Sequence, residues 1–222
     1  MVFSAQSTNE DLYALSRLAF DTLGVSHAYV AGLDQGWNDN ILVSADKNPN
    51  TAGAIAIGAG RLKSLMDLAN DLKSGKLSVL LVVGDAGVLG PKGTASLPLD
   101  KLDGLVVLGS HRGPLCDAAR VALPMAAWAE VDGTFTNRQG TVQRIRAAVS
   151  PVGDALPGWE IVSLLAHRLG TPMEFTGVDG RKLAPAAKSV FLEAKQKMAF
   201  MKNADWGRTS LPIQLRFANS RG

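Results

Sequence analysis

The segment GSHRGPLC places three reactive side chains close together, those of Ser110, His111 and Cys116. A hydroxyl or thiol beside an imidazole is the pair of groups that nucleophilic catalysis uses, so a small hydrolase is one hypothesis. The spacing does not fit the G-x-S-x-G nucleophile elbow, because GSHRG places its serine one residue too early, and no acid is clearly paired with His111. The alternative is a polar loop that caps a short helix, with Cys116 as a small buried residue.

Two glycine-rich segments could approach a phosphate group. The first, GDAGVLGPKG, begins with Gly84 and Asp85 and contains Lys92, but it lacks the Gly-Lys-Ser/Thr order of a Walker A loop. The second, GAG at residues 58–60, lacks the third glycine of a dinucleotide-binding fingerprint and does not follow a buried strand. Contact with a nucleotide and simple tight turns therefore both remain as interpretations of these glycines.

The remaining ligand-forming residues are too few or too scattered for a metal centre. The three histidines show neither H-x-H nor H-E-x-x-H spacing, which argues against a metal site. Cys116 is the only cysteine, so the chain can form neither an internal disulfide nor a cluster that needs four thiolates. Glu130 and Asp132 form a close carboxylate pair, which we expect to anchor a loop rather than to transfer protons. We therefore expect this chain to hold no metal and no cofactor of its own.

The elements that would position these residues follow from the apolar pattern. Residues 79–83, 105–108 and 121–123 are almost uninterrupted apolar runs, which are typical of strands buried on both faces. Apolar residues recur at helical spacing in four segments, and weaker strand signals accompany them. The helical segments are residues 8–23, 61–73, 158–169 and 185–202, and the weaker strands are residues 27–30 and 41–45. This alternation predicts a doubly wound, mostly parallel α/β sheet of the Rossmann-like nucleotide fold.

In a doubly wound fold, ligands bind at the carboxyl ends of the parallel strands. Gly84 and Asp85 follow the run at residues 79–83, and Ser110 and His111 follow the run at residues 105–108. Parallel strands end at the same edge of a sheet, so the two loops are expected to meet there. We therefore name these four residues as candidate cofactor-binding positions, in loops that are vestigial nucleotide loops if the fold has lost its ligand.

The pattern changes in the second half of the chain. Residues 125–130 favour a short helical turn, and residues 134–137 and 141–145 favour an irregular hairpin. The length of 222 residues supports one domain with an appendage. We predict an α/β domain over residues 1–170, followed over residues 171–222 by a linker, a C-terminal helix and an extended basic arm.

Composition and charge limit the expected partners. The net charge of +3 is small, and no aromatic-rich nucleic-acid motif accompanies the basic residues, so we expect no nucleic-acid partner. The sequence contains no apolar run of about 18 residues and no signal-like start. We therefore expect a cytoplasmic protein without direct membrane insertion, which reaches a membrane only through a larger complex. Trp and Arg are favoured interface anchors, and we assign this role to Trp37, Arg138, Arg144 and Arg208.

Several segments follow one another in the order of a known family. These are TNEDLYALSRLA, ADKNPNTAGAIAIG, LVVLGSHRGPLCDAARVALP and the long block AAWAEVDGTFTNRQGTVQRIRAAVSPVGDALPGWEIVSLLAHRLG. From Thr8 to Gly170 the sequence resembles the molybdopterin oxidoreductase family, and most of all the C-terminal part of the large iron–sulfur subunit of respiratory complex I, the NADH:quinone oxidoreductase (NADH dehydrogenase). This resemblance implies a non-catalytic structural or assembly module without a redox centre, packed against iron–sulfur and flavin subunits of the peripheral arm.

The same resemblance implies an alternative function. In molybdopterin enzymes the loops after these strands help to hold the guanosine end of the cofactor. The chain would then be the molybdopterin guanine dinucleotide-binding part of a formate dehydrogenase-like oxidoreductase. Gly84 and Asp85 match the start of the family's G-E-N loop, whereas Ala86 departs from it, and residues 115–118 replace the family's T-E-T-A. The sequence leaves both functions open.

Overall fold

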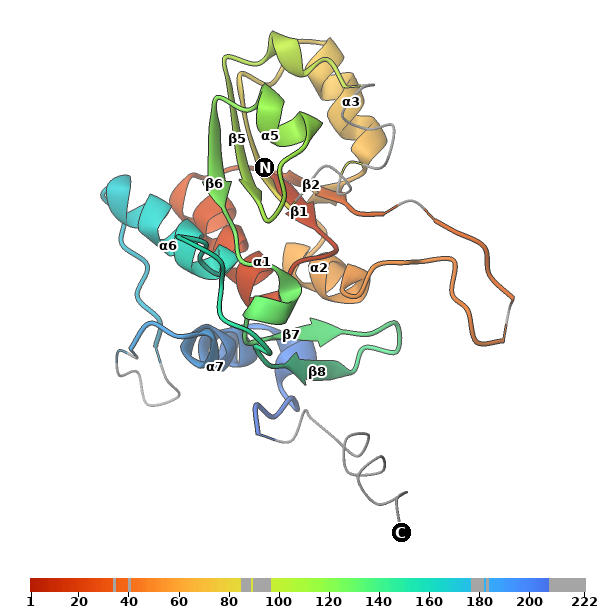
Figure 1. Cartoon of the computed structure of the whole chain (residues 1–222), viewed down its shortest axis with the longest axis vertical. Helices are drawn as coiled ribbons and strands as arrows, with labels where there is room; N and C mark the ends of the chain where they lie inside the picture. Colours follow the sequence, from red (N-terminus) through yellow and green to blue (C-terminus); the bar gives the residue numbers. More distant parts are fainter. Residues whose placement is uncertain are drawn as a thin grey trace.

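A computed structural model describes residues 1–33, 35–39, 41–84, 89, 97–176, 182 and 184–207, and a parallel sheet of six strands lies at their centre (Figure 1). The strands are β1 (Val2–Ser4), β2 (Ala28–Ala31), β3 (Leu62–Lys63), β4 (Val79–Val83), β5 (Gly104–Gly109) and β6 (Val121–Pro124). In space they follow the order β3-β2-β1-β4-β5-β6, and every neighbouring pair is parallel. The predicted doubly wound α/β fold is confirmed.

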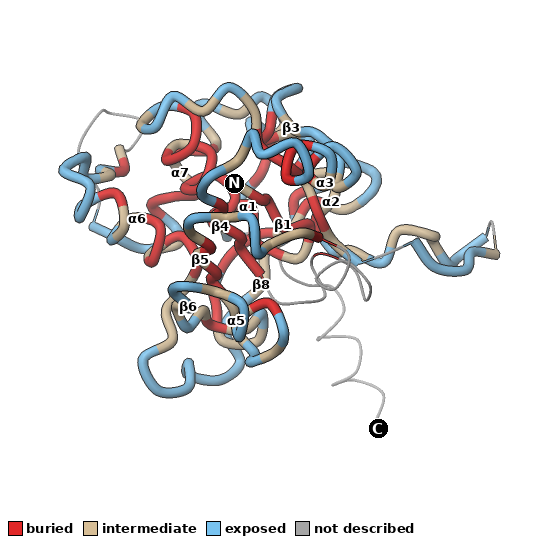
Figure 2. The backbone as a smooth tube through the Cα atoms, turned by 90° about the horizontal axis from the view of Figure 1, so that it is seen from above, coloured by how far each residue is buried: buried red, intermediate tan, exposed pale blue. Residues whose placement is uncertain are grey.

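Helices cover both faces of this sheet (Figures 1 and 2). On one face lie α1 (Asn9–Ser16), its π-helical continuation η1 (Arg17–Thr22), α2 (Thr51–Gly58) and α6 (Gly158–Arg168). On the other face lie α3 (Leu65–Lys73) and α5 (Pro114–Ala118). A further helix, α7 (Ala187–Lys197), packs against α1 and contributes to the same apolar core. The sheet is therefore the middle layer of a three-layer structure.

The central strands carry apolar side chains on both faces because helices cover both faces. In β1, Val2 belongs to the core on the α3 side and Phe3 to the core on the α1 side. In β4, Leu80 and Val82 lie in the α3-side core, whereas Val83 lies in the α1-side core. A strand directs successive side chains to opposite faces, so an unbroken apolar run fills two cores at once. Each large buried side chain contributes about 1.5–3 kcal/mol to stability.

A small antiparallel hairpin lies beside the main sheet and packs on α1 and α2. Its strands are β7 (Gly133–Thr136) and β8 (Val142–Ile145), and the one-turn helix η4 (Trp128–Glu130) precedes it. Both elements confirm the sequence predictions. Two side chains from the first half of the chain, those of Glu10 and Asn50, accept hydrogen bonds from the outer edge of β7. The amide of Thr134 donates to Glu10 Oε2 at 2.7 Å, and the amide of Thr136 donates to Asn50 Oδ1 at 2.7 Å.

Several local predictions were wrong. The strand β1 was not expected, because three residues at the start of the chain give too short a pattern. Residues 41–45 do not form a strand: they belong to a projecting loop, in which Ile41 is 84% exposed and Leu42 is 90% exposed. By contrast, the tight turn that was one interpretation of the glycines at residues 58–60 is confirmed, because they end α2 and Ala59 adopts a left-handed conformation with φ of 48°.

The segment predicted as one helix over residues 61–73 begins instead with the short strand β3. Ser64 and Asp67 form a capping box that fixes the start of α3 at Leu65, since Asp67 N donates to Ser64 Oγ at 3.2 Å and Ser64 N donates to Asp67 Oδ2 at 2.9 Å. The helix predicted over residues 185–202 is also shorter. It ends as α7 at Lys197 and is followed by the one-turn helix η5 (Ala199–Met201).

The described part of the C-terminal region packs closely on the α/β body. Tyr13 of α1 donates its hydroxyl to Glu193 Oε1 at 2.9 Å, and Arg17 Nη1 lies 3.1 Å from the same oxygen. Residues 208–222, to which the sequence assigns an extended arm, lie outside the described residues. Within the described part, each helix is too short or too polar to cross a lipid bilayer.

Candidate functional site

A cavity of about 670 Å³ opens at the carboxyl edge of the main sheet. The strand order reverses at this edge, between the neighbouring strands β1 and β4. From β1 the chain adds β2 and β3 on one side of the sheet, and from β4 it adds β5 and β6 on the other side. Open parallel sheets bind ligands at such a switch point, since the loops on its two sides diverge and leave a crevice. The volume lies in the range of about 300–1,000 Å³ that is usual for small-molecule sites.

The cavity is elongated along the sheet edge. Its lining comes from the ends of five neighbouring strands, with Leu33 after β2, Ser4 at the end of β1, Gly84 after β4, Ser110 after β5 and Met125 after β6. Neighbouring strands lie about 4.8 Å apart, so five strand ends extend over about 19 Å. A lining drawn from so many strand ends leaves room for an extended ligand such as a nucleotide.

The central part of the lining is polar. Gly84 has a positive φ of 112°, and its amide donates to Leu108 O at 2.7 Å, which holds the loop after β4 against β5. Ser7, in the loop between β1 and α1, is 5% exposed, and its Oγ makes no hydrogen bond within the described part of the chain. A buried hydroxyl without a partner costs free energy, unless a ligand in the cavity supplies the missing hydrogen bond.

The N-terminus of α1 also faces this polar centre. Thr8 and Asp11 form a capping box, in which the amide of Asp11 donates to Thr8 Oγ1 at 3.1 Å. Asp11 is buried as well, and Oδ1 accepts a hydrogen bond from the amide of Trp159 at 2.7 Å. Burial raises the pKa of Asp11, and the hydrogen bonds from Thr8 and Trp159 oppose that rise. Its carboxyl group is thus occupied in joining α1 to α6.

Ser110 and His111 line the cavity beside Gly84, so three of the four candidate cofactor-binding residues meet there. Ser110 Oγ lies 2.9 Å from His111 Nδ1, and Cys116 Sγ donates to His111 O at 3.4 Å. The three reactive side chains are therefore neighbours in space, but the hydrolase hypothesis stays a prediction. Asp85, the fourth candidate, lies outside the described residues.

The two ends of the cavity are apolar. Leu33 and Pro49 form one end, near β2, and the other end, near β6, contains Trp128. Other residues at the β6 end are Met125, Ala126, Val131 and Phe135. Trp128 lines the cavity and is still 74% exposed. The site thus combines a polar centre with apolar surfaces on either side.

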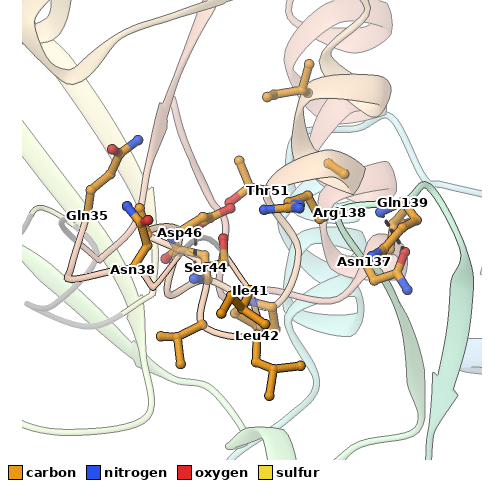
Figure 3. Close-up of a pocket in the computed structure, with 17 residues that line it drawn as sticks. Gln35, Asn38, Ile41, Leu42, Ser44, Asp46, Thr51, Asn137, Arg138 and Gln139 are labelled. Carbon is orange, nitrogen blue, oxygen red and sulfur yellow. Dashed lines mark hydrogen bonds between the residues drawn. The ribbon is translucent and has the colours of Figure 1, made fainter.

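A second cavity, of about 1030 Å³, lies between a projecting loop, α2 and the turn of the hairpin (Figure 3). The loop connects β2 to α2 and extends away from the body of the protein (Figures 1 and 2). Ile41 and Leu42 line the cavity from the loop, Thr51 lines it from α2, and Arg138 lines it from the hairpin turn. Of the predicted interface residues, Arg138 lines this cavity, and Trp37 lies exposed in the projecting loop.

Hydrogen bonds connect several described residues of the projecting loop. Asp39 Oδ1 accepts hydrogen bonds from the amides of Ile41, Leu42 and Val43 at 2.8–2.9 Å. Lys47 Nζ donates to the carbonyl oxygen of Trp37 at 2.8 Å, which ties the two sides of the loop together. The hydrogen bonds that the Asp39 carboxylate accepts from these backbone amides lower its pKa. The described residues of the loop therefore present the exposed apolar side chains of Ile41 and Leu42 next to a side-chain hydrogen-bond network.

The remaining predicted interface residues lie elsewhere. Arg144 of β8 is half-buried and makes contacts within the chain: Nη2 donates to Asp132 Oδ1 at 3.1 Å and Nη1 donates to Trp206 O at 3.1 Å. Its guanidinium group also stacks on the Trp206 ring, 4.2 Å from the centroid. The expected anchoring of the loop by Asp132 is thus confirmed. Arg208 lies outside the described residues.

Sequence reasoning did not place Ser7 and Trp128 in the lining of the first cavity. Ser7 precedes a capping threonine in a segment without glycine, so nothing marked it as a loop residue at a switch point. The available signal was the position of Trp128 shortly after a predicted buried strand, because ligands of a doubly wound fold bind beyond the carboxyl ends of its strands. In the described part of the chain, His, Cys, Asp and Glu form no group of three that could hold a metal ion.

One protein-family model matches most of this chain. The family model described as molybdopterin oxidoreductase matches residues 12–168, which is more than half of the chain. The chain belongs to the molybdopterin oxidoreductase family. The matched residues include five of the six strands of the sheet and the whole β6 end of the switch-point cavity.

Individual relatives are formate dehydrogenase subunits. The sequence is 51% identical over 72 residues to the F420-dependent formate dehydrogenase 2 subunit alpha of Methanococcus maripaludis, which is 32% of this chain and 11% of that protein. It is 50% identical over 72 residues to the F420-dependent formate dehydrogenase subunit alpha of Methanocaldococcus jannaschii, with the same shares of each chain. The chain thus spans about a tenth of the length of these relatives. They support the family but not the narrower resemblance to the large iron–sulfur subunit of complex I.

Proposed function

We propose that this chain binds the nucleotide end of molybdopterin guanine dinucleotide in the switch-point cavity, as part of a formate dehydrogenase-like oxidoreductase. The observation that carries the proposal is the cavity itself, which extends over five strand ends and has a polar centre between two apolar ends. The similarity to formate dehydrogenase alpha subunits supports the choice of this cofactor. A structural module of complex I, the first expectation from the sequence, has no such support.

The residues present fit such a group. A pyrophosphate in the centre would meet the hydroxyl of Ser7, which otherwise has no hydrogen-bond partner within the described residues, and the N-terminus of α1. At Gly84 the missing side chain lets the ligand approach the backbone closely, and its positive φ favours glycine over other residues. The bound cofactor supplies the redox chemistry of such an enzyme. This chain's own residues bind and orient its nucleotide end and exclude water from it.

Calorimetric titration with GDP tests the proposal. We expect a Kd of roughly 10 μM or lower, which corresponds to about −7 kcal/mol. Ala127→Trp places an indole into the cavity and should abolish GDP binding, because Ala127 lines it. The matched control is Ala52→Trp, which fills the second cavity and should leave GDP binding unchanged. A wild-type chain that does not bind GDP, or an Ala127→Trp variant that binds it normally, would contradict the proposal.

We further propose that the tip of the projecting loop docks on the remainder of such an enzyme. Ile41 and Leu42 are almost fully exposed, their amides donate to Asp39, and Arg138 lines the same cavity from the hairpin turn. Pre-organised apolar side chains beside an arginine are typical of interface anchors. The relatives are much longer than the matched segment, which covers 11% of each of them. Iron–sulfur and flavin subunits as partners stay a prediction.

Native mass spectrometry of the chain isolated from its own cells tests this docking. We expect the wild-type chain to co-purify with a partner that carries molybdenum or tungsten and iron–sulfur clusters. The double variant Ile41→Ser/Leu42→Ser should lose this partner and keep the wild-type circular dichroism spectrum and Tm, because both side chains are exposed. Retention of the partner by the double variant would show that the loop tip is not the docking surface.

A further inference from the structure

The exposure of Trp128 is not explained by the packing of the protein. Trp128 is 74% exposed, although Trp159 is buried in the core and Trp206 stacks against Phe191. Large aromatic side chains usually bury most of their surface, because doing so stabilises the fold. An indole that remains exposed at the mouth of a cavity gains a partner when a ligand enters.

The backbone beneath Trp128 is fixed on both sides. The amide of Ala127 donates to Glu130 Oε2 at 2.8 Å, and the amide of Glu130 donates to Ala127 O at 2.9 Å. The carbonyl oxygen of Ala129 accepts a hydrogen bond from the amide of Ala148 at 2.8 Å. Because these bonds hold the backbone of the turn, only the Trp128 side chain has to be ordered when a ring stacks on the indole.

Trp128 also lies at a suitable distance from the polar centre. β6 is two positions from β4 in the sheet, and two strand spacings amount to about 10 Å. This distance is comparable to the extent of a nucleotide from its phosphate to its base. A phosphate near Ser7 and Gly84 would therefore place an aromatic base close to Trp128.

The polar centre offers donors for that phosphate. The hydroxyl of Ser7 is buried and has no partner within the described part of the chain, and it lies where α1 begins. Two nearby hydroxyl-bearing residues, Ser4 and Ser110, line the same region. Among the described residues that line the cavity, Asp11 is the one with a carboxyl group, and hydrogen bonds from Thr8 and Trp159 already occupy both of its oxygens.

We infer that Trp128 is the stacking platform for the base of the bound nucleotide, while Ser7 donates a hydrogen bond to its phosphate. This inference rests on the proposed function and adds the orientation of the ligand: the phosphate lies at the strand-order reversal and the base at the β6 end of the cavity. Trp128 is thus a binding residue that sets the affinity for the base and not for the phosphate.

Titrations of the full chain with GMP, guanosine and inorganic pyrophosphate separate the two ends. We expect Trp128→Ala to weaken binding of GMP and guanosine about tenfold and to leave pyrophosphate binding unchanged. Trp128→Phe should restore most of the affinity, since a phenyl ring also stacks. Ser7→Ala should weaken binding of GMP and pyrophosphate and leave guanosine unchanged. The matched control is Trp37→Ala, which removes another exposed indole, 73% exposed in the projecting loop, and should change none of these affinities.

Tryptophan fluorescence gives a second readout. GMP should quench the emission of the wild-type chain and of Trp37→Ala, and it should quench Trp128→Ala much less. Normal GMP affinity and quenching in Trp128→Ala would overturn the platform and leave the proposed function intact. A wild-type chain that binds none of the three probes would instead overturn the proposed function, and the platform with it.

Discussion

Glu10 and Thr134 lie 124 positions apart in the sequence and form a doubly hydrogen-bonded pair in the interior. The amide of Thr134 donates to Glu10 Oε2 at 2.7 Å, and Thr134 Oγ1 lies 2.8 Å from Glu10 Oε1. Asn9 extends the contact, since its Nδ2 donates to the hydroxyl oxygens of Thr134 and Thr136 at 3.0 Å. The first turn of α1 thus hydrogen-bonds to one edge of β7 and holds the hairpin beside the switch-point cavity.

Glu10 should make the stability of the protein depend on pH. Burial raises the pKa of Glu10 from 4.5 to about 8, although hydrogen bonds from Thr134 lower it. Between these two pH values the folded chain retains a proton that the unfolded chain has released. The free energy of unfolding should therefore fall as pH rises through this window, by up to about 1.4 kcal/mol per pH unit.

The variant Glu10→Gln checks this dependence, because a neutral amide has nearly the same shape and cannot ionise. Urea unfolding at pH 5, 6.5 and 8 should show a smaller loss of stability in the variant than in the wild type. Some loss should remain, since burial also raises the pKa of Asp11. An unchanged pH dependence in Glu10→Gln would mean that Glu10 is ionised in the folded chain at neutral pH.

Asn50→Ala should destabilise the hairpin contact. Asn50 is fully buried, its Oδ1 accepts from the amide of Thr136 at 2.7 Å, and its Nδ2 donates to Ser7 O at 2.8 Å. Removing the side chain leaves two buried backbone groups unpaired, at a cost of roughly 1–3 kcal/mol each. Thermal unfolding should show a clearly lower Tm. The control Asn38→Ala, at an exposed loop position, should change stability by less than about 0.5 kcal/mol.

Gly133→Ala should also destabilise the protein, for a steric reason. A Cβ atom at Gly133 would lie 2.8 Å from Thr8 Cγ2 and 3.0 Å from Glu10 Oε2. Neither neighbour can move easily, since Thr8 caps α1 and Glu10 binds Thr134, so we expect a loss of roughly 1–3 kcal/mol. Gly104→Ala is the matched control, because its Cβ would meet Val79 at an ordinary distance of 3.5 Å. Equal denaturation midpoints for the two variants would contradict the expected clash.

Arg144→Lys should loosen the segment around Trp206. Arg144 binds Asp132 and the carbonyl oxygen of Trp206, and it stacks on the Trp206 ring. Lysine cannot make the same planar contacts, and loss of the stacking alone costs about 0.5–2 kcal/mol. Limited proteolysis should cleave near residues 203–207 faster in this variant than in the exposed control Arg146→Lys. Equal cleavage rates would leave Arg144 free for the partner interface that the sequence analysis assigned to it.

The sequence predicted those features that depend on local patterns. The buried runs at residues 79–83, 105–108 and 121–123 became β4, β5 and β6, because an apolar run without polar interruption suits a strand covered on both faces. The same rule failed for residues 41–45. Local hydrophobicity does not distinguish a strand in the core from an exposed tip such as that formed by Ile41 and Leu42.

The sequence by itself determined the alternation of strands and helices, the hairpin and the family, since each is written in residue spacing or in a matching block of residues. Only the tertiary structure decided the strand order, and with it which loops meet. Gly84, Ser110 and His111 were predictable as loop residues, but Ser7 and Trp128 joined them only because β1 pairs with β4 and β6 lies at the sheet edge. Strand pairing is set by contacts between residues far apart in the chain, and no local pattern records them.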